Sequence, residues 1–230
     1  MLTIFIVPFS IDIINHMNLL VGLFFLHNVL ATAYLGGKFV TQNDKVFKSF
    51  GIALLLNCVA FAIWSFAVLT KPADLTFYVT LGVVFFIAAL VFLLNTGVQH
   101  LKSNSRWMVL IVGSLLAVVL FYLRTFVYPS NASFSPEGFF FFNVHPFMQM
   151  FYIFGLVISA LPAIYAVASK FRNYYADLMR FCFPIEVAGG IILITTMDTQ
   201  VLYLTGWIMG IAYFALWAPL LFSKKAWVTD

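Results

Sequence analysis

Charge is scarce in this chain. Asp, Glu, Lys and Arg together make up only 9% of its 230 residues, whereas 63% of the residues are hydrophobic. A soluble domain carries roughly 25% charged residues, so the shortage of charge excludes an ordinary soluble globular protein. Because the lipid-facing surfaces of membrane-spanning helices must be apolar, this composition predicts an integral membrane protein.

Cysteine is also rare. The chain has two cysteines, Cys58 and Cys182, and they form no C-x-x-C pair. Both lie within apolar stretches, where a free cysteine behaves as a small buried hydrophobic residue. We therefore interpret both cysteines as packing residues.

Several motifs that identify classes of enzyme or carrier are absent. The sequence contains no Walker motif, no G-x-S-x-G and no H-E-x-x-H. The last apolar run has no lysine, which argues against a retinal Schiff base of the microbial-rhodopsin kind. The two halves of the chain show no clear inverted symmetry, which weakens a transporter interpretation.

Long apolar runs are what the chain has in abundance. A run of about 20 apolar residues can cross the hydrocarbon core of a bilayer as a helix. Residues 1–11 lack the basic start and the cleavage site of a signal peptide. The sequence therefore predicts an all-α bundle of seven transmembrane helices in a single domain, residues 1–230, from seven runs at about 13–36, 49–70, 76–98, 107–127, 145–169, 179–196 and 199–222.

The basic residues predict the orientation. Only Lys71 and Arg124 of the twelve Lys and Arg residues lie on the side opposite to the rest. Because basic residues favour cytoplasmic loops, we expect the N-terminus outside and the C-terminus inside, and we place the multi-pass protein in the bacterial inner membrane. The net charge of +4 then reflects topology and gives no indication of nucleic-acid binding. The ten residues on the cytoplasmic side are Lys38, Lys45, Lys48, Lys102, Arg106, Lys170, Arg172, Arg180, Lys224 and Lys225.

The four histidines are candidate metal ligands. His16 and His27 are eleven residues apart, which places them on nearly the same helix face, about 16 Å from each other. His145 precedes Pro146, a residue suited to the first turn of a helix, so it marks the outer end of the fifth run at the depth of His16. His27 and His100 both lie toward the inner side, although their depths differ by about 15 Å.

One helix carries a family resemblance. The segment LHNVLATAYLGG, residues 26–37, combines a histidine with small residues. It resembles the histidine- and glycine-containing helices of membrane b-type cytochromes and of haem- or copper-handling membrane proteins. The resemblance implies one or two b haems, with His16 and His145 as axial ligands of an outer haem and His27 and His100 serving an inner haem. The same small residues also permit close helix packing, and the histidines could instead be interfacial or hydrogen-bonded to a neighbouring helix.

Glu186 is the strongest isolated feature. It lies near the middle of the sixth run, in FPIEVAGG. A carboxyl group inside the bilayer must be paired, solvated or protonated, because hydrocarbon disfavours its charge. Functional interpretations are a proton relay, part of a quinol pocket, or a cation site. The structural alternative is a protonated Glu186 that hydrogen-bonds to a neighbour such as Asn57.

Arg124 lies at the outer end of the fourth run, against the positive-inside pattern. Its guanidinium group could pair with a haem propionate or another anionic ligand, or it could extend to the interface as an isolated residue. It could also pair with an external acid of the chain. These acids are Asp12, Glu137 and Asp198.

Three functions remain open on these grounds. The leading hypothesis is a membrane-embedded haem b electron-transfer protein, a subunit of a respiratory or redox complex that passes electrons to partner subunits or to quinone, with Glu186 carrying the coupled proton. A second hypothesis is a small-solute or ion transporter or channel, in which Glu186, His27 and Asn57 line a site at the midplane. A third is a non-catalytic assembly or receptor-like subunit whose polar residues serve helix packing. The residues leave open whether the protein is an enzyme.

Overall fold

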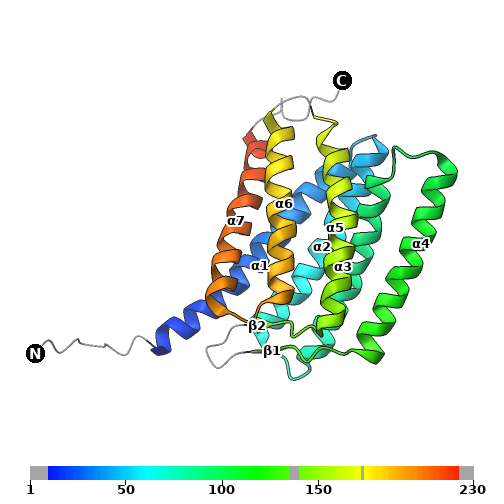
Figure 1. Ribbon diagram of the computed structural model, residues 1–230. Coiled ribbons are helices and arrows are strands. Elements are labelled where there is room, and N and C mark those ends of the chain that lie inside the picture. The colour runs from blue at the N-terminus through cyan, green and yellow to red at the C-terminus, as the bar shows by residue number, and fades with distance from the viewer. Residues whose placement is uncertain (1–9, 135–139, 172–173, 223–230) are drawn as a thin grey trace, which may run out of the picture.

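The computed structural model describes residues 10–134, 140–171 and 174–222, and these residues are almost entirely helical (Figure 1). The all-α class predicted from the apolar runs is confirmed. A short π-helical turn, η1 (Leu123–Val127), continues the fourth helix, and two short strands, β1 (Ser133–Phe134) and β2 (Phe140–Phe141), form an antiparallel pair. The α-helices of the described residues are α1 (Ser10–Val40), α2 (Lys45–Thr70), α3 (Leu75–Gly97), α4 (Ser103–Tyr122), α5 (Pro146–Ala168), α6 (Tyr174–Thr195) and α7 (Thr199–Phe222).

Six helices of the described part, α2 to α7, are long and apolar enough to cross a membrane. This finding supports a multi-pass membrane protein, as the composition predicts. The helix α1 is not among the six, so the count of seven spans stays a prediction. The orientation relative to the two sides of the membrane stays a prediction as well.

The long helices run alternately up and down, so the bundle has two distinct ends (Figure 1). We call the end with the α1–α2, α3–α4 and α5–α6 connections the basic end, and the end with β1 and β2 the hairpin end. Lys71 and Arg124 are the basic residues of the hairpin end within the described part of the chain. The described basic residues of the basic end are Lys38, Lys45, Lys48, Lys102, Arg106, Lys170 and Arg180.

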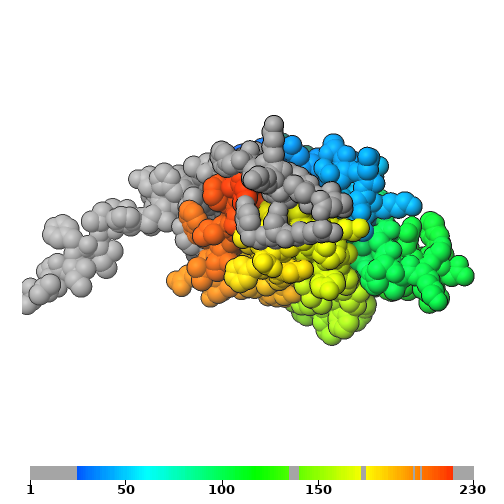
Figure 2. Space-filling model, turned by 90° about the horizontal axis from the view of Figure 1, so that it is seen from above, coloured from blue at the N-terminus to red at the C-terminus, as the bar shows by residue number. Residues whose placement is uncertain are grey.

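Six of the described helices form a closed ring. In order around the ring, neighbouring helices pack as α1–α2–α3–α5–α6–α7, and α7 returns to α1. Helix α4 lies outside the ring and packs on α3, and it forms the margin of the molecule when the bundle is viewed from the basic end (Figure 2). Only 11% of its most apolar stretch is buried, against 28% to 39% for the other candidate spans. The ring, rather than the full set of helices, therefore encloses the core.

Close packing of α1 on α2 depends on two glycines. A Cβ atom added at Gly36 would lie 3.0 Å from the Gly51 carbonyl oxygen, and one added at Gly51 would lie 2.6 Å from the backbone nitrogen of Val40. Each backbone therefore occupies the space that a larger side chain would need. Of the two roles considered for the small residues of this helix, Gly36 has the packing role.

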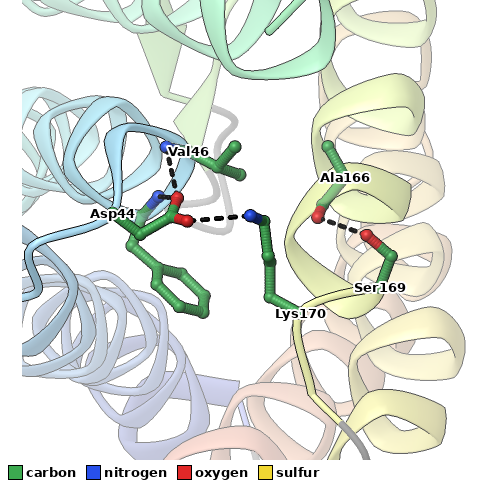
Figure 3. A network of polar contacts seen from close by, with 6 residues as sticks. Asp44, Val46, Ala166, Ser169 and Lys170 are labelled. Carbon is green, nitrogen blue, oxygen red and sulfur yellow. Dashed lines mark hydrogen bonds and ion pairs between the residues drawn. The ribbon is translucent and has the colours of Figure 1, made fainter. Parts of the chain in front are cut away.

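An ion pair joins two connections at the basic end (Figure 3). Lys170 Nζ lies 2.8 Å from Asp44 Oδ2, and Asp44 also caps α2 by accepting from the backbone N–H groups of Val46 and Phe47. Burial acts to raise the pKa of the Asp44 carboxyl, but the hydrogen bonds from Lys170 and from the two backbone groups outweigh burial, and the pKa is lowered overall.

Candidate binding cavity

A cavity of about 130 Å³ lies inside the ring. Every ring helix contributes to its wall, and Phe142 and Val144, which follow β2, line it toward the hairpin end. The wall is predominantly aromatic and aliphatic. One lining residue from each ring helix, in the order of the chain, is Phe25, Asn57, Phe86, Tyr152, Glu186 and Tyr213.

Glu186 is the acidic residue of this wall. Its side chain is buried, with 8% of the residue exposed, and neither carboxyl oxygen has a hydrogen-bond partner within the described residues. Pro184 lies two residues earlier in α6, where its missing N–H removes one helical hydrogen bond. Gly189 follows, and a Cβ atom there would collide with the side chain of Met209, so α6 and α7 approach closely beside the carboxyl group.

Two further polar residues of the wall lie near mid-helix, like Glu186. Asn57 of α2 faces the cavity across the ring from α6, and its amide oxygen has no hydrogen-bond partner among the residues described. Tyr213 of α7 is close enough to Glu186 for the phenol and the carboxyl group to interact electrostatically. A hydrogen bond between Glu186 and Asn57, which the structural interpretation of Glu186 needs, is not present in the described part of the chain.

His27 does not line the cavity and instead forms a hydrogen bond between two helices. Its Nε2 atom accepts a hydrogen bond of 3.2 Å from Nε1 of Trp217, which joins α1 to α7. The transporter hypothesis groups His27 with Glu186 and Asn57 at one midplane site. The cavity brings Glu186 and Asn57 together, and His27 is not one of its lining residues.

His145 lies at the hairpin end, at the start of α5. Its Nδ1 atom accepts a hydrogen bond from the backbone N–H of Phe147, so the histidine caps α5 and Pro146 occupies the first turn. Its exposed ring stacks on Tyr128, with 4.6 Å between the ring centroids. The helix start predicted from the His-Pro pair is confirmed.

The structure does not test the remaining proposed haem ligands as pairs. His100 is exposed in the turn that follows α3, whereas His27 lies about 20 Å from the basic end of α1 at 1.5 Å per residue. The side chain of His16 lies outside the described residues. No cluster of three or more His, Cys, Asp or Glu residues able to hold a metal ion occurs within the described ranges. The pairing of His16 with His145, and of His27 with His100, stays a prediction.

Arg124 lies in the η1 turn and is 1% exposed. Within the described residues, no acceptor lies in hydrogen-bond geometry with its three guanidinium nitrogens. Tyr152, a buried residue of the cavity wall, is close enough to interact electrostatically with the guanidinium group. Asp198, one of its suggested partners, instead caps α7 by accepting from the backbone N–H groups of Gln200 and Val201. The side chains of Asp12 and Glu137, the other suggested partners, lie outside the description.

Sequence reasoning missed the aromatic members of the site. Tyr152 and Tyr213 carry hydroxyl groups into the core, and Trp217 donates to His27. The chain has 28 Phe, 10 Tyr and 5 Trp residues, and hydropathy does not separate those that face the cavity from those that face lipid. The cysteines agree with their interpretation as packing residues: Cys182 is buried, and the half-buried Cys58 donates a weak hydrogen bond to the carbonyl of Val29.

No protein-family model and no curated protein sequence matches this chain. The resemblance to b-type cytochromes thus rests on the one segment of α1. The geometry of the cavity has to support the functional interpretation.

Proposed function

We propose that this protein is a membrane carrier that binds a small solute in the central cavity, with Glu186 as the recognition group. The observation that carries the proposal is the Glu186 carboxyl, whose two oxygens are without hydrogen-bond partners among the described residues and which lines the central cavity. This is the transporter hypothesis raised by the sequence, changed in one respect: Tyr213, and not His27, joins Glu186 and Asn57 in the cavity wall.

A purely structural carboxyl group would be expected to have a protein partner. Burial of a polar group without a compensating hydrogen bond costs about 1–3 kcal/mol in proteins, and burial of a full charge costs more. In α6 the missing partner coincides with a space beside the carboxyl. A solute that enters this space can supply the hydrogen bonds or the opposite charge that the wall lacks.

The dimensions of the cavity limit the solute. An engineered cavity of about 150 Å³ in another protein holds one benzene molecule, so a cavity of about 130 Å³ suits a guest of similar size. The lining reaches Phe50 and Leu93 toward the basic end and Phe142 toward the hairpin end. Phe142 packs edge-on against Trp64, with 5.0 Å between the ring centroids, and closes the hairpin end. Release on that side requires this aromatic contact to open.

Uptake into proteoliposomes tests the proposal. Neutral, anionic and cationic solutes of up to about six non-hydrogen atoms are applied in stopped-flow light-scattering measurements of vesicle volume. We expect at least one of these solutes to enter faster than in protein-free vesicles and Glu186→Gln to abolish the difference. Asp198→Asn is the matched control, because it removes an exposed acid and keeps a good capping residue at α7. Equal permeation of the whole set with and without protein would refute the proposal.

The haem hypothesis stays a prediction with a separate test. A haem has several times the volume of benzene, so it would have to bind elsewhere than the central cavity. A reduced-minus-oxidised spectrum of the purified protein with an α-band of b type, lost in His27→Ala, would support it. A colourless preparation from a host that supplies haem would refute it.

A further inference from the structure

The charge of the cavity wall favours one sign of guest. Glu186 is the acid of the wall, and no Lys, Arg or His is among the lining residues that the structure describes. Arg124 acts on the site through Tyr152 and is itself not a lining residue. A carboxylate or phosphate would meet no positive group in the described wall near Glu186, whereas a cation would meet its one acidic side chain and could stabilise the ionised carboxylate.

The aromatic residues of the wall favour the same sign. The face of an aromatic ring carries partial negative charge and attracts a cation placed over it, and this attraction increases when water is excluded. Rings surround the space from several helices. Those from α2, α3, α6 and α7 are Phe50, Phe61, Trp64, Phe86, Phe183 and Tyr213.

A metal cation fits this wall poorly. Calcium takes six to eight oxygen ligands, and magnesium requires six in a near-ideal octahedron. At the depth of Glu186 the described wall offers the two carboxyl oxygens and the amide oxygen of Asn57, with the Tyr213 hydroxyl nearby. An organic cation needs few hydrogen bonds, because its methyl or methylene groups pack on the rings.

We infer that the solute recognised by this cavity is a small organic cation of the alkylammonium class, held by Glu186 and by the aromatic wall. The inference rests on the proposed function and names the class of its substrate. The volume of about 130 Å³ restricts the class to ions of about the size of tetramethylammonium. Large lipophilic cations such as tetraphenylphosphonium are too big for the same space.

Isothermal titration calorimetry on the full chain in detergent tests this assignment. The probes are tetramethylammonium chloride, the neutral tert-butanol, which has nearly the same shape, and the anion pivalate. We expect saturable binding of tetramethylammonium with one site per chain, at least about tenfold tighter than either other probe. Glu186→Gln should weaken binding at least tenfold, and Asp198→Asn should leave it unchanged. Phe183→Leu, which keeps an apolar side chain of similar size, should weaken it several-fold and retain the fold.

The outcomes separate this inference from the proposed function. Equal binding of tetramethylammonium to the wild-type protein and to folded Glu186→Gln would overturn the assignment. Tighter binding of tert-butanol or pivalate would also overturn it, and the cavity would remain a site for another solute. If no probe binds, but a different solute enters proteoliposomes in a Glu186-dependent manner, the cation class is wrong and the carrier proposal holds. If no probe binds and no solute enters, both are wrong.

Discussion

Two buried ionisable residues of this protein, Glu186 and Arg124, have opposite surroundings. Both lie within candidate membrane spans, and within the described residues neither has a hydrogen-bond partner. Glu186 borders the central cavity, so a guest inside that cavity can contact its carboxyl group. Arg124 lies on a π-helical turn, 1% exposed, with the buried Tyr152 as its polar neighbour. An unpartnered buried group therefore indicates a binding site only where space adjoins it.

The largest expected effects come from leucine substitutions at two alanines of α5, one in the cavity wall and one in a packed interface. Ala160 lines the cavity, whereas Ala163, one turn later in α5, is fully buried. Ala163 packs against α3, because a Cβ atom added at Gly97 of α3 would lie 3.1 Å from the backbone nitrogen of Ala163. We expect Ala163→Leu to lower the free energy of unfolding by about 1–3 kcal/mol through overpacking. Ala160→Leu should abolish solute uptake because its side chain occupies the cavity, with a change in stability below about 1 kcal/mol. Thermal unfolding in detergent and uptake by proteoliposomes measure the two quantities.

The same pair of variants could contradict the comparison. Equal destabilisation by both leucines would mean that Ala160 is packed as tightly as Ala163 in the membrane. Normal uptake by Ala160→Leu would mean that the solute does not use this space.

A smaller effect is expected at Arg124. Arg124→Met keeps a long side chain and removes three guanidinium nitrogens that make no hydrogen bond with good geometry in the described part and have Tyr152 as their polar neighbour. Relief of that desolvation should raise the free energy of unfolding by about 1–2 kcal/mol, with uptake within about twofold of the wild type. Thermal unfolding and uptake are again the measurements. A loss of stability would show that the Arg124 guanidinium has an anionic partner in the membrane. Arg124 would then be a paired group, and of these two residues only Glu186 would lack a partner within the described part of the chain.

The smallest effect is expected at an ordinary exposed ion pair. Asp44→Asn removes the pair with Lys170 but retains a capping side chain for α2. Partly exposed pairs contribute less than about 1 kcal/mol, so the loss at pH 7 should stay below that figure. Because the pKa of Asp44 is lowered in the folded state, its contribution is fully present above the ordinary value of 3.8 and is lost as the pH falls through the lowered pKa. Thermal unfolding of the two proteins should therefore converge at low pH, and a difference that persists there would assign the effect to something other than the charge.

Much of the fold could be predicted from the sequence, because segment length and hydropathy decide which stretches become membrane helices. The run at 145–169 corresponds to α5 (Pro146–Ala168) almost residue for residue, since Pro146 defines its start. The run at 179–196 begins later than α6 (Tyr174–Thr195), because Asp177 lowers the hydropathy of a turn that is still helical. The ring and the exclusion of α4 were not predictable, because lipid-facing and core-facing side chains are both apolar.

The candidate site was predictable only in part. Glu186 and Asn57 stand out because polar residues are rare in apolar runs, and the cavity brings them together. The sequence did not indicate that Tyr213, and not His27, lies beside Glu186 in the cavity wall. That outcome depends on how α1 and α7 pack on each other. The partner of His27, Trp217, is an aromatic residue with no signal that separates it from the other aromatic residues.

The closure of the ring has a consequence for synthesis. The seam between α1 and α7 carries the Trp217–His27 hydrogen bond, whose two residues are 190 positions apart in the chain. At about 5–20 residues per second, α1 waits on the order of 10–40 seconds for its last neighbour to be translated. Glu186 is translated only 31 residues before Trp217, so for about the last 2–6 seconds of that interval it lies in a bundle that is still open between α1 and α6. The nascent protein therefore needs temporary shielding of the Glu186 carboxyl group. A chain truncated before α7 lacks the helix that closes the ring between α6 and α1.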